Sequence, residues 1–404
     1  MRVRRRAATS AMLIFLLLTL TPGVSGYSVD TTIAQGGGCP LPDRWNAAAG
    51  GISRQWSTAL PAPSTIVTAV TKSESAELDE IEAAISDSFG AWTGVTGTTL
   101  NAAAYPASFA ALGRTSAQNA CTNDAESNVD GQNTICFDQS SAAFTSGVLS
   151  FTRTFTANSP GASVAAGPPA AFAGQILDAD TLLRNDGQVK FATPAGLATP
   201  AGAGAYDLES ILTHELGHWM GLDHSAVIRS MMFPFSPPPG QFTGARPTAQ
   251  APDGPLADDD RTGLRAQYPD PNDAVNTGTI QGRLFPANPF SLAALPAPAA
   301  GQSVTGIFGA QVVAVDTATG SVVAGTIGGW SCSAGDTMAQ FDGTFEIDRL
   351  PVGQSYVIYA EPLVGLAAPG AFANALQDLC ANGALCTTPA ANLNFNVRAM
   401  PGSQ

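Results

Sequence analysis

The chain has 404 residues, with 18 lysines and arginines, 32 aspartates and glutamates, and a formal net charge of −14. An acidic chain without a basic patch is a poor partner for nucleic acid or for an anionic membrane surface. The length exceeds what one domain usually needs, so we expect two domains.

The first 26 residues have the pattern of a secretory signal. Four arginines precede the apolar run Ala11 to Leu20, and the small residues Val24 to Gly26 offer a cleavage site. The run is too short for a bilayer span, and an N-terminal anchor is the less favoured alternative. No other stretch is long and apolar enough to cross a membrane. We therefore expect a secreted protein with no membrane segment after cleavage.

Six cysteines in an exported chain favour disulfides. The pairs close in the sequence are the ones we expect to be bridged: Cys121 with Cys136, and Cys380 with Cys386. Cys39 and Cys332 are left over, and the sequence does not fix the connectivity.

Residues 44 to 184 combine one long helix with several short strands. Ser75 to Thr93 is a predicted amphipathic helix with acidic residues near its N-terminus. Strands are expected at Ile66–Val70, Ile135–Asp138, Gly147–Thr156 and Gln175–Leu183.

The segment 119–133 is rich in Asn, Asp and Gly. Asp124, Glu126 and Asp130 offer the oxygen ligands that suit Ca²⁺. Their spacing matches no defined calcium loop, so a solvated turn is the favoured interpretation.

One stretch reads His-Glu-x-x-His-x-x-Gly-x-x-His and contains all three histidines of the chain. His214 and His218 are four residues apart and lie on one side of a helix, where two neutral imidazoles can hold one Zn²⁺. Gly221 permits the left-handed turn that brings His224 back as a third ligand. Glu215 lies beside the ligands and can take a proton from a water in the open fourth position.

The helix that carries the motif is expected to begin after Asp207, as N-cap, and to end near Gly221. The alternative is an ordinary helix with solvated or core histidines. No Lys or Arg lies between Lys190 and Arg229 to pair with Glu215. A buried carboxylate without a partner is costly, and a bound dication removes that cost, so the metal site is favoured.

These residues resemble the metzincin metallopeptidases, and among them the matrixins. Ser225 after the third histidine carries the matrixin resemblance, and so does Ser230 to Pro234, which is similar to the Met-turn of that family. Leu256 to Leu264 resembles the acidic start of the family's last helix, which we expect to run to Tyr268.

The resemblance implies an α/β (α+β) catalytic domain with a mixed twisted sheet and long helices. It implies one zinc ion, a protein or peptide substrate, and a strand along the cleft that pairs with extended substrate. The implied roles are metal ligands for His214, His218 and His224, general base for Glu215, and support beneath the site for Met232.

The segment Cys39 to Asp43 has a faint similarity to the latency segment of matrixins, in which a propeptide thiolate occupies the zinc. Only about a dozen residues separate Cys39 from the expected cleavage site, too few for a folded prodomain. A disulfide or a loose N-terminal thiol is the favoured interpretation.

From Thr277 the pattern changes to short alternating strands with Gly and Asp turns. We expect strands at Thr279–Phe285, Gly309–Asp316, Ser321–Thr326, Thr344–Ile347, Ser355–Glu361 and Asn392–Arg398. This pattern predicts an antiparallel β-sandwich. Phe341 to Tyr356 is similar to carboxypeptidase regulatory-like (transthyretin-like) domains, which implies a structural or adhesive role.

We therefore expect a signal peptide at 1–26, a catalytic domain at 27–270, a linker at 271–276 and an all-β sandwich at 277–404. The predicted function is that of a secreted zinc endopeptidase. An extracellular adhesion or matrix-binding protein with a vestigial zinc site is one alternative, which the intact Glu215 disfavours. A zinc hydrolase acting on something other than protein is another.

Overall fold

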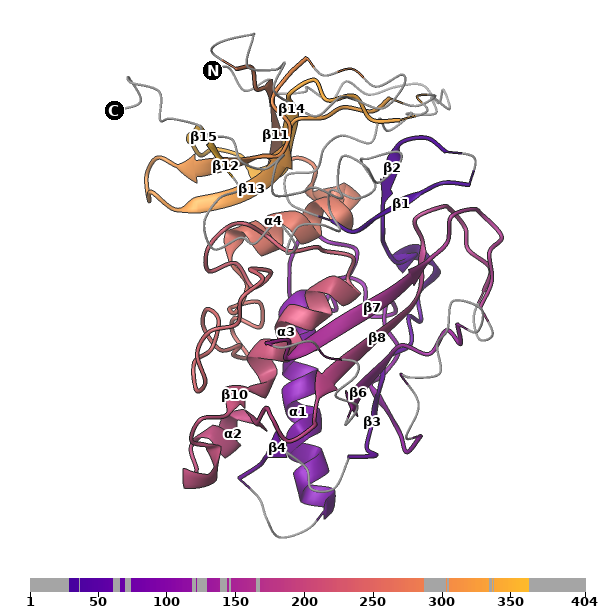
Figure 1. Ribbon diagram of the computed structural model, residues 1–404, viewed down its shortest axis with the longest axis vertical. Coiled ribbons are helices and arrows are strands. Elements are labelled where there is room, and N and C mark those ends of the chain that lie inside the picture. Colours follow the sequence, from indigo (N-terminus) through magenta and orange to yellow (C-terminus); the bar gives the residue numbers. More distant parts are fainter. Residues whose placement is uncertain are drawn as a thin grey trace.

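The computed structural model describes residues 29–362, apart from residues 36, 61–65, 70–73, 118–120, 122–128, 139–143, 145–146, 165–167, 287–302, 304, 334–335 and 337. The predicted signal, the Cys380–Cys386 pair and the strand expected at Asn392–Arg398 lie outside the described residues. Figure 1 shows a larger region of helices and strands below and a smaller strand-rich region above, with helix α4 between them.

The larger region is built on a five-stranded sheet of order β5-β3-β6-β8-β7. The first four of these strands pair in parallel, and β7 joins the edge antiparallel to β8, so the sheet is mixed as predicted. The strands are β3 (Gln55–Ser57), β5 (Gly113–Thr115), β6 (Thr134–Asp138), β7 (Ser150–Thr156) and β8 (Ile176–Arg184).

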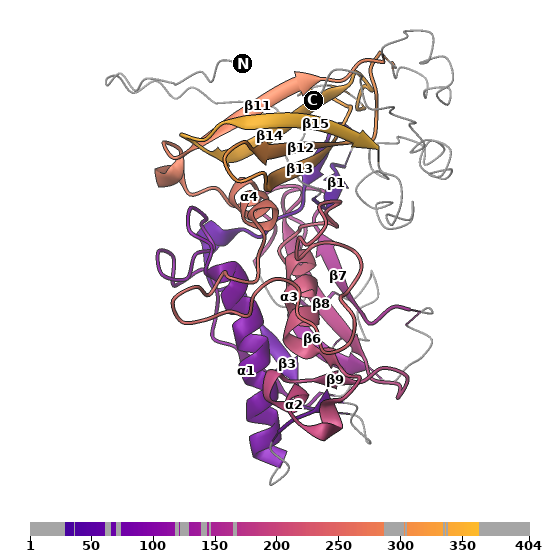
Figure 2. The ribbon, with the colours of Figure 1, turned by 90° about the vertical axis from the view of Figure 1, so that its left-hand side faces the viewer.

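Helices α1 (Glu74–Thr93) and α3 (Leu208–Trp219) pack on one face of this sheet and against each other (Figure 2). Successive strand residues point to opposite faces, so Ile135 and Phe137 join the core under the helices. Cys136 between them faces away, where its disulfide with Cys121 confirms the predicted pair.

Two side chains of α1 fix the position of α3. The Trp92 indole N–H donates to the carbonyl of Thr213 at 2.8 Å, and the Ser88 hydroxyl donates to the carbonyl of Glu209 at 3.0 Å. Both α1 residues are fully buried. The helix that carries the histidine motif is thereby anchored to the core along its length.

The strand expected at Ile66–Val70 is only β4 (Ile66–Val67), and it lies outside the main sheet. It pairs with β9 (Phe191–Ala192), which in turn pairs with β10 (Tyr206–Asp207). The strand that enters the main sheet before α1 is β3, which the sequence did not indicate because three residues are too few to show alternation. The remaining short elements are β1 (Thr31–Ile33), β2 (Pro40–Pro42), α2 (Pro194–Leu197) and 3-10 turns at Ala47–Ala49, Pro200–Gly202 and Pro271–Asp273.

The smaller region contains five of the six expected strands, arranged as two antiparallel sheets, β11-β14 and β13-β12-β15. Both sheets contribute to one apolar cluster that includes Val312, Phe345 and Ile347. The strands are β11 (Thr277–Arg283), β12 (Ala310–Asp316), β13 (Val322–Gly328), β14 (Thr344–Pro351) and β15 (Tyr356–Pro362). A complete sandwich stays a prediction, because its last expected strand is outside the described residues.

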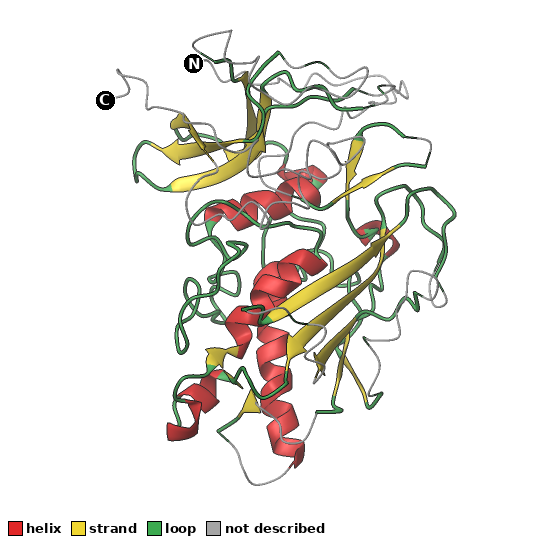
Figure 3. Cartoon of the chain, viewed as in Figure 1, coloured by secondary structure: helices red, strands yellow, loops and turns green. Residues whose placement is uncertain are grey.

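Besides the continuous chain, a helix and a disulfide connect the larger and the smaller region. Helix α4 (Asp258–Gln267) packs against β13 and β14 (Figure 3). The two cysteines left over in the sequence form a disulfide, Cys39–Cys332, which ties the segment before β2 to the smaller region. Because Cys39 is bridged, it has no thiolate to offer a metal. Within the described part of the chain, no helix combines the length and the apolarity that a membrane span requires.

Candidate metal centre

The helix α3 begins and ends as its sequence predicts. The Asp207 side chain accepts from the backbone N–H of Ser210 at 3.1 Å and so caps the first turn. The last helical residue is Trp219, whose ring packs 4.8 Å from that of Trp45. The Trp45 indole N–H donates to the Trp219 carbonyl at 2.8 Å, which satisfies one of the carbonyls at the helix end.

The chain then reverses at Gly221, whose φ of +83° lies in the left-handed region. A Cβ at this position would collide with the backbone carbonyl oxygen of Asp43. Glycine is therefore required here by conformation and by space. The reversal brings His224 back to the two histidines of the helix.

The three imidazoles converge on one point. Their ring centroids are 5.0 Å apart for His214 and His218, 4.8 Å for His218 and His224, and 5.4 Å for His214 and His224. One ring nitrogen from each lies within 4.8 Å of the others. All three residues are half-buried.

The hydrogen bonds of two histidines determine which nitrogen is free. The Nδ1 of His214 lies 2.7 Å from the carbonyl oxygen of Met231, and that of His218 lies 2.8 Å from the carbonyl oxygen of Leu222. A carbonyl only accepts, so Nδ1 carries the proton and Nε2 keeps a lone pair. Burial lowers the pKa of both imidazoles, which keeps them neutral. Three imidazoles that converge on one point fit a tetrahedral zinc ion with an open position.

Glu215 lies beside this point and is held by the edge strand of the sheet. It is buried, and its two carboxylate oxygens accept from the hydroxyls of Ser150 at 2.6 Å and Thr152 at 2.9 Å. Burial raises the pKa of Glu215, and these two hydrogen bonds oppose the rise. Among the described residues no lysine or arginine pairs with Glu215, and two hydroxyls of β7 hold it instead. The electrostatic effect of His224 also opposes the rise in the pKa of Glu215.

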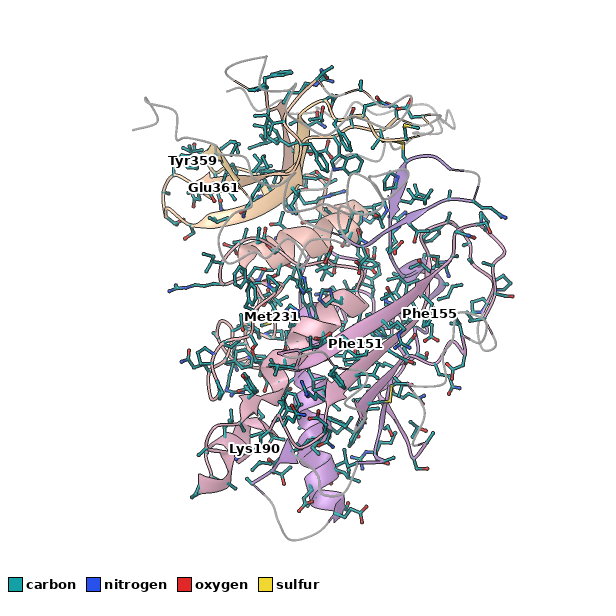
Figure 4. The ribbon with its side chains drawn as sticks, in the orientation of Figure 1. Phe151, Phe155, Lys190, Met231, Tyr359 and Glu361 are labelled. Atoms are coloured by element: carbon teal, nitrogen blue, oxygen red, sulfur yellow. A yellow bond between two sulfur atoms is a disulfide. The ribbon has the colours of Figure 1, made fainter. Side chains whose placement is uncertain are left out.

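The segment predicted as a Met-turn lies directly against α3. Met232 is buried, and its sulfur occupies the space that a side chain on Gly217 would need, between the two helical histidines. Its neighbour Met231 supplies the carbonyl that orients His214. Figure 4 shows Met231 beside α3 and Phe151 on β7.

Asp260 of α4 holds the backbone of that turn. Its carboxylate accepts from the N–H groups of Met231 at 2.7 Å and Met232 at 3.1 Å, and from the hydroxyl of Ser230 at 2.5 Å. The acidic start of the last helix thus fixes the loop that packs against α3 and supplies the carbonyl to His214.

The N-terminus of α3 is covered by the proline-rich segment 235–255. Arg246 in that segment pairs with Asp207 and lies 3.3 Å from Glu209. Burial raises the pKa of Glu209 to about 7, against the effect of Arg246 and with support from the charges of Asp207 and Asp87.

The sequence did not single out Ser150, Thr152 or Asp260 as part of the site. Ser150 and Thr152 are two apart in a predicted strand, which places them on one face, but nothing in the sequence relates that face to Glu215. Asp124 and Glu126 of the calcium alternative lie outside the described residues. Asp130 is described, and its carboxylate accepts from the backbone N–H of Gln132 at 2.6 Å, as in a local turn.

Comparison with known proteins places this centre in a family. The profile described as Matrixin (Peptidase_M10) matches residues 62–268, which is half of the chain and includes the three histidines, Glu215 and the Met-turn segment. Metalloendoproteinase 1 from Glycine max is similar to this chain, with 39% identity over 64 residues. That alignment covers 16% of this chain and 17% of the relative. The family implies zinc binding and metallopeptidase chemistry, which agrees with the donor set described above. The chain belongs to the matrixin family of metallopeptidases.

Proposed function

We propose that this protein is a secreted zinc endopeptidase in which His214, His218 and His224 hold one zinc ion and Glu215 is the general base. The observation that carries the proposal is the convergence of three imidazoles beside a buried carboxylate that two hydroxyls of β7 hold in place. A zinc ion bound there would polarise the scissile carbonyl and activate a water molecule for attack.

Each residue of the chain has a distinct task in this proposal. Glu215, held by Ser150 and Thr152, takes the proton of the attacking water and passes it to the leaving amine. Met232 packs beneath the ligands and keeps the two helical histidines in place. The carbonyl of Met231 keeps His214 in the tautomer that binds metal.

The strand β7 is the best place for an extended substrate. It is the edge of the five-stranded sheet, with β8 as its only partner among the described strands. It also carries the two hydroxyls that hold Glu215, so a peptide added beside it would pass close to the base. We propose that a protein or peptide substrate pairs with this edge in the antiparallel sense. The signal predicted at 1–26 and the disulfides support an extracellular site of action.

We further propose the domain division given above, with a catalytic domain at 27–270, a linker at 271–276 and a C-terminal β-sandwich at 277–404. Two antiparallel sheets with a shared apolar cluster support the sandwich.

A casein or gelatin zymogram of the full chain, with and without a chelator, tests the function. We expect a cleared band that disappears with chelator and returns when zinc is added back. Zinc-loaded, folded protein that clears neither substrate and cleaves no member of a peptide library would contradict the proposal. That result would favour an adhesion protein or a hydrolase of another substrate class.

A further inference from the structure

One carboxylate joins the loop after the third histidine to the smaller β region. Asp259 of α4 is 1% exposed. One of its oxygens accepts from the hydroxyl of Ser225 at 2.5 Å, and the other accepts from the backbone N–H of Gly325 in β13 at 2.6 Å. Burial and the adjacent Asp260 raise the pKa of Asp259 to about 7. This buried carboxylate therefore links the larger region, through Ser225, to the smaller region, through Gly325.

Ser225 is the residue that follows His224, so its position determines the direction in which the chain leaves the third ligand. Its hydroxyl donates to Asp259 and accepts from the N–H of Val227 at 3.1 Å. Its own N–H donates to the carbonyl of Met232 at 2.8 Å. The hydrogen bond to Asp259 therefore holds the loop that runs from His224 to Met232.

The backbone of β13 also presses directly on this loop. A Cβ at Gly325 would lie 2.8 Å from a methyl carbon of Val227, which is 7% exposed. Gly325 does not have a positive φ, so space, not backbone conformation, accounts for glycine at this position. A small cavity lined by Ser225, Ala226 and Gly325, among others, lies at the same contact.

A second connection to the smaller region involves the residues that precede His224 in the chain. The N–H of Asp30 donates to the carbonyl of Gly221 at 3.1 Å, and Val29 forms a β-bridge with Leu222. The same N-terminal segment is tied to the smaller region by the disulfide between Cys39 and Cys332. The stretch that presents His224 is thus held on both sides by contacts that lead to the smaller region.

We infer that the C-terminal β region is a working part of the metal centre, in which β13 acts through Asp259 and Val227 to position Ser225 and, through it, His224. Asp259 is a positioning residue in this scheme. The inference rests on the proposed zinc site and adds a dependence of zinc retention on the smaller region. A module attached only by a flexible linker would have no such effect.

Two substitutions on β13 test this in the full, zinc-loaded chain. Gly325→Ala places a methyl group against Val227, in the loop of the metal site. Gly328→Ala places a methyl group 2.6 Å from the Cβ of Phe345, inside the smaller region's own core, and is the matched control. The readout is the rate of zinc release to an excess of a chromogenic chelator, with the melting temperature measured in parallel.

We expect Gly325→Ala to release zinc about tenfold faster, in the range seen when residues that support metal ligands are changed. Gly328→Ala should lower the melting temperature but release zinc at the wild-type rate. Adding Val227→Ala to Gly325→Ala removes the collision and should return the rate to within about twofold of the Val227→Ala single variant. If Gly325→Ala does not fold, Ser225→Ala takes its place, with faster release expected from the lost hydrogen bond to Asp259.

A folded Gly325→Ala protein that releases zinc at the wild-type rate would overturn the inference, and so would equal acceleration by Gly328→Ala. Either result would leave the peptidase proposal intact, because the wild-type chain would still hold zinc. A wild-type chain that binds no zinc would overturn both, before any variant is compared.

Discussion

Replacing Gly221 by alanine at the turn before His224 should lower stability for two separate physical reasons. The first reason is the left-handed φ of +83°, and the second is contact of the added Cβ with the carbonyl oxygen of Asp43. Gly187 offers a control, because its φ is +82° and a Cβ there would meet nothing within 4 Å. The two positions thus match in backbone angle, whereas Gly221 is buried and meets the collision and Gly187 is exposed and does not.

The magnitudes follow from these two terms. Placing an alanine in the left-handed region costs roughly 1 kcal/mol, and Gly187→Ala should lose that amount of unfolding free energy. At Gly221 the collision is with backbone, which no side-chain rotation relieves. The backbone there is also held, since the Gly221 N–H donates to the His218 carbonyl at 2.8 Å. Forcing it apart adds about 1–3 kcal/mol, so Gly221→Ala should lose about 2–4 kcal/mol in total.

Urea unfolding of both variants in excess chelator measures these losses without a contribution from zinc binding. The structure predicts that Gly221→Ala is the more damaging by at least about 1 kcal/mol. Equal losses for the two variants would refute the packing of the turn against Asp43, and with it the account of how His224 is presented.

Three further predictions concern residues around the site. Glu209 has a pKa raised to about 7 in the folded protein, so the folded state keeps a proton on Glu209 between pH 4.5 and 7 that the unfolded state has lost, and the stability contributed by Glu209 falls as pH rises through that interval. Glu209→Gln should therefore gain stability relative to wild type by up to about 3 kcal/mol between pH 5 and 8 in urea titrations. A constant difference between the two proteins across that range would count against the raised pKa. Replacing Cys121 and Cys136 by serine opens a loop with a sequence separation of 15 and should lower the free energy of unfolding by about 3 kcal/mol. The rate of zinc release should not change, because the bridge lies on the sheet face away from the helices, and faster zinc release would contradict that placement. Ser150→Ala removes one donor to Glu215 and should lower kcat about tenfold with KM within about twofold, whereas an unchanged kcat would mean that Ser150 does not position the base.

Much of the metal centre could be predicted because its geometry is local. The i, i+4 spacing of His214 and His218, the cap at Asp207 and the glycine at 221 each constrain only a few neighbouring residues, and the structure has all of them as expected. Local periodicity likewise predicted α1, β6 to β8 and the five described strands of the smaller region.

What the sequence did not indicate depends on packing between distant segments. The donors to Glu215 come from a strand 63 and 65 residues away, and the Cys39–Cys332 bridge joins residues 293 apart. Asp258, Asp259 and Asp260 are identical in type, yet Asp259 and Asp260 are buried while Asp258 is not. Their different roles follow from how α4 sits between the Met-turn and β13, which no local pattern encodes.

In the proposed mechanism three histidines hold one zinc ion and Glu215 transfers the proton of the attacking water. The rate of peptide hydrolysis per bound zinc ion, measured for wild type and for Glu215→Ala, tests this most directly. We expect about one zinc per chain in both proteins and a rate at least a hundredfold lower in the variant. A Glu215→Ala protein that retains zinc and hydrolyses peptide at the wild-type rate would contradict it.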